Sequence, residues 1–278
     1  ADGQRFCFLN QVSDRIELWI GETASGRITL VPDLAMNPTL SSEATWMPAQ
    51  RTLLVKRVPP GRGAPPEEAQ APSGPNVQEC AGQSASSTYE ARDVLTSPRD
   101  EALFEFYALS QLALVDARTG TVTPVGEPGI LAEVQPAPDG HRILVERIQK
   151  PWSYLHAWYR FPKDVEIWNL EGKTEHLLAH LPLADQVPIH GVPEGPRDYS
   201  WRPTEPATLV WTEAQDRGDP ARKVAHRDLV MIQQAPFKNQ PRELYKAPHR
   251  VQGWWWSGSD DLILVAEYER ERRWRYVW

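Results

Sequence analysis

Residues 198–213 read DYSWRPTEPATLVWTE, and this stretch decides the fold. Its two apolar runs, 199–201 and 209–211, have the aromatic and aliphatic content that is typical of strands. A turn rich in Pro and Thr separates the two runs, and it has about the length that a hairpin requires. The stretch therefore predicts a pair of antiparallel strands.

The same design recurs three more times along the chain. In each copy a turn follows an apolar run, and the returning apolar run begins five or six positions after the Pro or Ser of that turn. The copies are Trp46-Met47-Pro48 before 53–55, Pro136-Ala137-Pro138-Asp139-Gly140 before 143–145, and Trp255-Trp256-Ser257 before 262–265. The chain therefore contains an internal repeat.

A second kind of hairpin, which in most copies has a glycine in its turn, alternates with the first. Its copies pair 16–20 with 28–31, 112–116 with 121–125, 165–169 with 174–178, and 229–233 with 242–245. The repeating unit is therefore four strands, which we denote A, B, C and D. Units of this kind that repeat roughly every 40 to 50 residues are typical of a β-propeller, in which each unit forms one blade.

The predicted fold class is all-β, a partial β-propeller of four-stranded antiparallel blades. The pattern supplies strands B, C and D of a first blade, three whole blades, and A, B and the start of C of a fifth, so about four to five blades. Residues 1–278 are predicted to form one incomplete propeller domain. We expect the open strand edges to make a separately expressed 1–278 chain aggregate or dimerise.

An irregular insertion at 59–99 interrupts the repeat. Residues 59–87 are rich in Pro, Gly, Ala and Ser, and we expect them to be mobile because they can bury little apolar surface. A short helix is expected at 90–96. Residues 100–109 fit neither the helical nor the strand period cleanly, and we interpret them as a strand because the repeat requires one before Leu112.

Composition and charge exclude several classes of partner. The formal net charge of -7, without a stripe of Lys and Arg, argues against nucleic acid. No apolar run approaches the roughly 20 residues that span a bilayer, so no membrane partner is expected. No cofactor and no metal site are predicted, because two cysteines cannot provide a four-ligand zinc site. His176 and His180 fall on a predicted strand, about 13 Å apart, and Asp216 and Asp219 are interpreted as turn residues.

The long connections are predicted to gather on one face of the propeller. Successive strands of a blade run antiparallel, so the B-C and D-A connections lie together, and they hold nearly every long segment. These segments are 59–99, 150–163, 181–197 and 215–227. Because long loops in compact domains are usually functional or disordered, this face is the candidate working face.

Several motifs resemble one known family. They are Trp152-Ser153-Tyr154-Leu155, Tyr159-Arg160-Phe161-Pro162, Val165-Glu166-Ile167-Trp168, Leu181-Pro182-Leu183-Ala184, Val187-Pro188-Ile189, Tyr199-Ser200-Trp201-Arg202-Pro203 and 213–219. The chain is similar, over nearly its whole length, to the propeller of prolyl oligopeptidase family serine peptidases, in the branch of the chloroplast glutamyl endopeptidase and its bacterial relatives. It departs from that pattern at Arg217, where the family usually has glycine.

The resemblance implies a parent enzyme in which the propeller covers an α/β-hydrolase domain with a Ser-Asp-His triad, and which cleaves peptides after Glu. The expected partners are that catalytic domain of the same protein and the peptide substrate. The chain contains no G-x-S-x-G elbow, so we expect it to hold no catalytic residue and to be inactive alone. Export to the periplasm is expected from the bacterial relatives, with the cytoplasm as the alternative.

The expected role is therefore non-catalytic, the control of substrate access to a serine peptidase. The alternative is a stand-alone propeller that acts as a protein-binding scaffold, although the chain lacks the Gly-His and Trp-Asp pairs of WD repeats. The candidate substrate-binding residues are Arg160, Arg197, Tyr159, His156 and Trp158. The arginines would pair with an acidic side chain of the substrate, whereas the aromatic residues could equally fill the interface with the catalytic domain.

Overall fold

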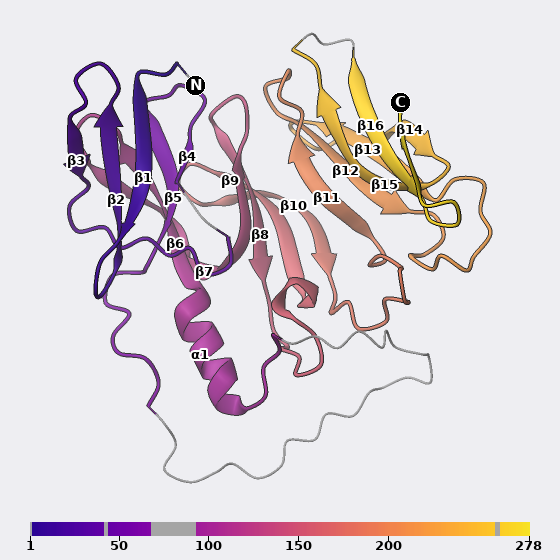
Figure 1. Cartoon of the computed structure of the whole chain (residues 1–278), viewed down its shortest axis with the longest axis horizontal. Coiled ribbons are helices and arrows are strands. Elements are labelled where there is room, and N and C mark those ends of the chain that lie inside the picture. The colour runs from indigo at the N-terminus through magenta and orange to yellow at the C-terminus, as the bar shows by residue number, and fades with distance from the viewer. Residues whose placement is uncertain (1, 42–43, 68–92, 259–261) are drawn as a thin grey trace. The chain divides into compact units, whose positions relative to one another are not determined.

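The computed structural model describes residues 2–41, 44–67, 93–258 and 262–278. The chain divides into two compact units, each described here by itself. The first comprises Ala1–Glu79, Arg92–Pro136 and Gly140–His180, and the second comprises Cys80–Ala91, Ala137–Asp139 and Leu181–Trp278. The described secondary structure consists mostly of antiparallel strands (Figure 1).

The first unit begins with a three-stranded sheet in the order β1-β2-β3. Its strands are β1 (Arg5–Gln11), β2 (Ile16–Glu22) and β3 (Ile28–Leu30). They are the B, C and D strands that the repeat predicts for the first blade. Strand β1 pairs only with β2 among the described strands, so one of its edges is open.

The second sheet of this unit has seven strands in the order β10-β9-β8-β7-β6-β5-β4. They are β4 (Ala44–Trp46), β5 (Thr52–Arg57), β6 (Leu109–Asp116), β7 (Val122–Pro136), β8 (Arg142–Ile148), β9 (Lys163–Asn169) and β10 (Thr174–Leu181). The predicted hairpins at 46–55, 112–125, 136–145 and 165–178 are all present. The sequence pattern predicts two blades here, and the structure joins them in one sheet.

Strand β7 is the element that joins them. Its residues up to Ile130 pair with β6, and its residues from Leu131 onward pair with β8. One extended segment is thus strand D of one blade and strand A of the next. The connection that the repeat places between these two strands is therefore part of the sheet rather than a loop.

The turn between β9 and β10 packs closely against β7. The backbone nitrogen of Gly126 donates a hydrogen bond to the carbonyl oxygen of Glu171 at 3.1 Å. A Cβ atom added to Gly172 would lie 2.1 Å from the Gly126 nitrogen. Gly172 also has a φ of 79°, which disfavours other residues. Only glycine fits this contact, which explains its place in the turn.

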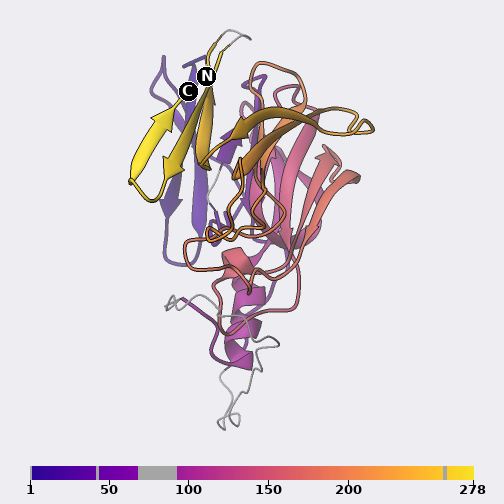
Figure 2. The same cartoon turned by 90° about the vertical axis from the view of Figure 1, so that its right-hand side faces the viewer.

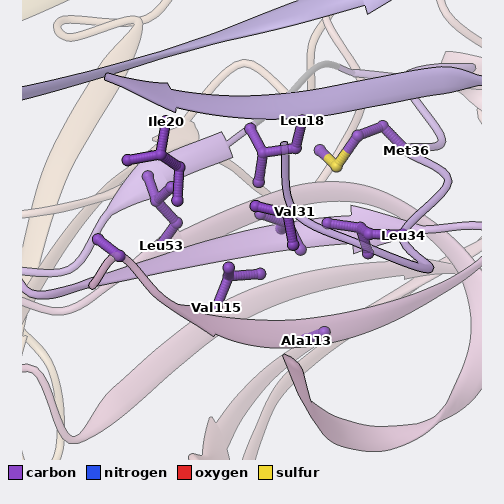
Figure 3. Packing of buried hydrophobic residues seen from close by; sticks show 10 residues of the cluster. Leu18, Ile20, Val31, Leu34, Met36, Leu53, Ala113 and Val115 are labelled. Carbon is purple, nitrogen blue, oxygen red and sulfur yellow. The ribbon is translucent and has the colours of Figure 1, made fainter. Parts of the chain in front are cut away.

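One hydrophobic core of the first unit lies between its two sheets. Leu18 and Ile20 of β2 pack against Leu53 of β5 and Val115 of β6 (Figure 3). These residues alternate along their strands with residues of the opposite face, as the two-residue period of a strand requires. Burial of this apolar surface is the main force that holds the sheets together.

The segment 100–109 was predicted to form a strand, but all of it except Leu109 belongs to a helix, α1 (Pro98–Ala108). The Ser97 hydroxyl accepts a hydrogen bond from the backbone nitrogen of Asp100 at 3.2 Å, and Pro98 occupies the first turn. Both features favour a helix start. The strand required before Leu112 begins at Leu109. The prediction was wrong because it relied on the strand that the repeat requires before Leu112, although the capping residues already indicated a helix.

Other predictions for the insertion have mixed outcomes. The short helix expected at 90–96 is wrong for 93–96, which contain no helix. Two parts of these predictions lie outside the described residues, namely 90–92 of the expected helix and 68–87 of the segment expected to be mobile. No helix among the described ones has the length and apolar character needed to cross a membrane.

The second unit contains two sheets. One has the order β11-β12-β13-β14 and the other β15-β16-β17. The strands are β11 (Pro196–Trp201), β12 (Thr208–Ala214), β13 (Asp228–Gln234), β14 (Arg242–Ala247), β15 (Arg250–Trp256), β16 (Ile263–Glu269) and β17 (Trp274–Val277). The hairpin of 198–213 is confirmed, with Trp201 opposite Leu209. Val210, Val230 and Val265 contribute to the core that the two sheets share.

A glutamate two positions before a tryptophan recurs in two strands of the first unit. Glu17 of β2 accepts a hydrogen bond from the Trp19 indole at 3.1 Å, and Glu166 of β9 accepts one from Trp168 at 3.0 Å. Residues two apart lie on the same face of a strand, which brings the groups together. Arg15 and Arg147 supply ion pairs to the two carboxylates. The motif is structural, because it supplies hydrogen bonds and ion pairs to carboxylates that are almost fully buried.

Candidate functional site

The loop between β8 and β9 holds four of the five candidate residues. The Ser153 hydroxyl accepts hydrogen bonds from the backbone nitrogens of Leu155 and His156, at 3.1 and 3.2 Å. A short 3-10 helix, η1 (Trp158–Arg160), follows and ends in a hydrogen bond from Phe161 to the Trp158 carbonyl. The loop is therefore shaped by its own hydrogen bonds.

Helix α1 anchors this loop. The ring of Phe104 lies edge-on to Trp152, with ring centroids 5.2 Å apart, and edge-on to Phe161 at 5.6 Å. The Trp152 indole donates a hydrogen bond to Glu105 at 2.7 Å, and the Lys150 ammonium lies 2.6 Å from the same carboxylate. Both views show α1 extending beyond the ends of β6 and β7 (Figures 1 and 2). Helix α1 thus supports the loop.

The four candidate residues of this loop differ in exposure, and only Tyr159 is exposed. Tyr159 is 58% exposed, and Trp158 packs edge-on against it with centroids 6.2 Å apart. Arg160 is partly buried, and no side chain among the described residues forms an ion pair with its guanidinium. His156, two residues before Trp158 in the sequence, is also partly buried. These four residues belong to one short segment, 156–160, and the described contact among their side chains is that between Trp158 and Tyr159.

The Glu105 anchor predicts a dependence of stability on pH. Partial burial acts to raise the pKa of Glu105, but hydrogen bonds from Lys150 and Trp152 outweigh it and hold the pKa below its ordinary value of 4.5. Glu105 also raises the pKa of Lys150 through their hydrogen bond. The stability from a carboxyl with a lowered pKa is present above its unfolded pKa and disappears as pH falls through its folded pKa.

We therefore expect Glu105→Gln to lower the melting temperature at about pH 6 and to have progressively less effect below about pH 4. The measurement is thermal unfolding of the chain and its variant across that range. Glu127→Gln is the matched control, because Glu127 is exposed on β7 and none of the described hydrogen bonds involves it. A Glu105→Gln difference that stayed constant with pH would show that the carboxylate is not the anchor.

The fifth candidate, Arg197, lies on β11 in the second unit, in a different setting. Its Nη2 atom lies 2.6 Å from Oδ2 of Asp228, which is fully buried, and its Nε atom lies 3.3 Å from Asp198. Arg250 also contacts Asp228, at 2.6 Å, and continues to Asp216. Arg197 therefore belongs to a buried ion-pair network.

Asp216 forms the other half of this network and confirms the interpretation of its segment as a turn. Its Oδ2 atom accepts hydrogen bonds from Arg227 at 2.8 Å and Arg250 at 2.6 Å, and its Oδ1 atom accepts one from the Gly218 nitrogen. Arg217 has a φ of 55°, in the left-handed region. This conformation explains why a glycine is usual there in the resembling family.

Sequence reasoning missed Asp228, Arg250 and the role of Asp216. No local pattern in the sequence marks these residues, because Asp216 lies in a turn and Arg250 lies on a distant strand, and the two meet only in the folded chain.

His176 and His180, which were predicted to lie on a strand, do lie on one strand, β10. His180 forms a short contact with Asp164, and the described part of the chain has no group of His, Cys, Asp and Glu that could hold a metal.

No protein-family model matches the chain. Over its full length the chain is 35% identical to a probable chloroplastic glutamyl endopeptidase from Oryza sativa subsp. japonica, and 33% identical to a protein of the same name from Arabidopsis thaliana. The sequence is therefore similar to glutamyl endopeptidases over the whole length of the chain. It spans 30% of the length of each of these two proteins. The resemblance to the glutamyl endopeptidase branch is thereby confirmed.

Solved structures confirm the propeller fold of the chain. The β-propeller domain of the Trilobed protease from Pyrococcus furiosus matches all of the chain and 66% of its own length, with a TM-score of 0.52 and 9% identity. An acylaminoacyl peptidase from Pyrococcus horikoshii matches 98% of the chain and 36% of its own, with a TM-score of 0.52 and 11% identity. At such identities the likeness concerns the fold. The number of blades stays a prediction.

Proposed function

We propose that this chain is the non-catalytic propeller part of a serine peptidase, in which it restricts the access of peptides to a catalytic α/β-hydrolase domain. The similarity to two proteins named as glutamyl endopeptidases, which extends over the whole chain, carries this proposal. Both proteins are more than three times as long as their match to the chain. A catalytic domain in the remaining length is the partner that the proposal requires.

The preference for Glu is proposed to depend on Arg160. Its guanidinium has no ion-pair partner among the described residues, and the residue before it in the sequence, Tyr159, has an exposed side chain. A planar guanidinium can bind a carboxylate through two parallel hydrogen bonds. Arg197 is less suited to this role, since two carboxylates of its own unit already contact it.

The test uses the whole protein that carries this chain. Arg160→Ala is expected to lower the ratio of kcat/KM for cleavage after Glu to that after Gln by about tenfold, the loss of one charge-assisted pair. Arg160→Lys should retain part of the preference. Arg118→Ala, at an exposed position in the turn between β6 and β7, is the matched control and should leave the ratio unchanged. An unchanged ratio in Arg160→Ala would remove Arg160 from the proposal.

Access control has a separate test. If the propeller restricts entry, the whole protein should cleave short peptides with one Glu efficiently and should cleave the same sequence poorly when it lies within a folded protein. The alternative role, a binding scaffold, predicts no cleavage of either substrate. Equal rates for the short peptide and for the folded protein would contradict restricted access.

A further inference from the structure

The sheet β1-β2-β3 has one face that the packing described above leaves open. Leu18 and Ile20 of β2 point to the other face and pack against β5 and β6. Side chains alternate along a strand, so Trp19, which lies between them, points to the open face. Phe8 of β1 pairs with Trp19, and Phe6 lies two positions before Phe8 on the same side. Phe6 is 41% exposed and Phe8 is 39% exposed.

The open face is apolar, and its aromatic rings are nearly parallel. The rings of Phe6 and Phe8 have centroids 6.3 Å apart and an interplanar angle of 20°, and those of Phe8 and Trp19 lie 6.3 Å apart at 12°. Gly21 leaves room for the Phe6 ring, because a Cβ atom there would lie 2.2 Å from Cζ of Phe6. Ile28 of β3 pairs with Gly21 and is exposed. We call Phe6, Phe8, Trp19 and Ile28 the aromatic face.

The pair of Phe8 and Trp19 has a counterpart in β8 and β9. Ile143 of β8 pairs with Trp168 of β9. In both hairpins the indole donates a hydrogen bond to the glutamate two positions before it. The two hairpins also hold the same place in the four-strand repeat, as strands B and C. The aromatic face is therefore equivalent to the face of β8 and β9 that carries Ile143.

That equivalent face is covered by strands that come earlier in the chain. Ile143 is fully buried and Trp168 nearly so, in a core cluster that includes Leu54 of β5. The same holds for β5 and β6, where the paired residues Leu53 and Val115 are fully buried against β2. In both places an apolar face of antiparallel strands provides the cover. The corresponding positions in β1 and β2 carry equally apolar side chains.

We propose that the aromatic face binds the apolar face of a further antiparallel sheet, which belongs to the same whole protein. The two equivalent faces within the first unit are covered in this way, and contiguous exposed apolar patches usually mark contact surfaces. The chain spans 30% of the length of the two glutamyl endopeptidases that it matches, so a protein of that size has enough further polypeptide. This proposal concerns assembly and does not depend on peptide cleavage.

The first experiment measures burial of the aromatic face by hydroxyl-radical footprinting of the whole protein that carries this chain. The oxidation rate of each side chain is compared with its rate in a peptide digest of the same protein. Phe6 and Phe8 are expected to be protected as strongly as Phe161, which is 2% exposed. Oxidation of Phe8 several-fold faster than that of Phe161, as its present exposure would give, would overturn the proposal.

The second experiment identifies the occupant. The photoreactive residue p-benzoylphenylalanine replaces Phe8 in the whole protein, and mass spectrometry locates the cross-link. We expect a link within one polypeptide, to a segment outside 1–278 in which apolar and polar residues alternate as in a strand. A link between two polypeptides would indicate a second copy, and a link to the segment with a G-x-S-x-G elbow would indicate the catalytic domain. Either result would overturn the proposal.

Position 28 provides a second site if the replacement of Phe8 prevents folding. Ile28 is more exposed than Phe8, at 48%, so a larger side chain disturbs the packing of the described residues less. The same segment should be linked from this position. Thr29 is the matched control, because it is the exposed neighbour of Ile28 and points to the opposite face of β3. An equal yield of that link from Thr29 would contradict the assignment to the aromatic face.

Discussion

Asp228→Ala is expected to destabilise the chain by about 3 to 5 kcal/mol, the cost of breaking a buried ion pair by removing one partner. The Asp228 carboxylate is fully buried and lies 2.6 Å from both Arg197 and Arg250. Its removal leaves two guanidinium groups, each 12% exposed, without this acceptor. It also removes the acceptor of the Val251 backbone nitrogen.

Urea denaturation of the chain, followed by circular dichroism, measures this effect as a shift of the midpoint. Glu194→Ala is the matched control, because it removes an ion pair of the same unit, with Arg217, in which both side chains are about 60% exposed. An exposed pair contributes about 0 to 1 kcal/mol. A similar small shift for Asp228→Ala would mean that the network contributes no more than a surface pair.

Phe161→Ala is expected to have a comparable effect, about 3 to 5 kcal/mol, because it leaves a cavity in the aromatic cluster. Phe161 is 2% exposed, and its ring lies 5.6 Å from those of both Phe104 and Trp152. Since Phe104 belongs to α1, the substitution should loosen the helix as well as the loop. Amide exchange in residues 100–108 should therefore accelerate more than exchange in β8.

Tyr159→Ala is the control for this prediction. Tyr159 lies two positions away in the same loop, is aromatic, and is 58% exposed, so its removal should change stability by no more than about 0.5 kcal/mol. Equal losses for the two variants would indicate that the exposed ring is as well packed as the buried one. That outcome would contradict the division of the loop into an anchored side and an exposed side.

The strands could be predicted from sequence because each is short, has its own turn and recurs. The pattern of 198–213 and its copies predicted hairpins that the structure contains. The helix α1 was missed because Leu103, Phe104, Phe106 and Tyr107 do not form a single apolar face, so the period gave no clear indication. Only the cap at Ser97 and Pro98 distinguished the two states.

The site was harder to predict than the fold. The segment 151–162 was correctly placed between strands, whereas the two interpretations of its aromatic residues, substrate binding and contact with a catalytic domain, stay predictions. Trp152 packs against α1, whereas Tyr159 remains exposed. The buried contacts of Arg197 could not be predicted, because Asp228 and Arg250 are brought to it by strand pairing over long sequence distances. Charge alone does not distinguish a surface arginine from a buried one.

Strand β7 has a consequence for how the first unit opens. Because its early part pairs with β6 and its later part with β8, one continuous backbone segment belongs to both ladders. Breaking the hydrogen bonds between β7 and one neighbour would therefore weaken those between β7 and the other. We therefore expect its amides to exchange with solvent in a single cooperative opening that includes β6 and β8. The blade boundary in the sequence is thus not a boundary of independent unfolding.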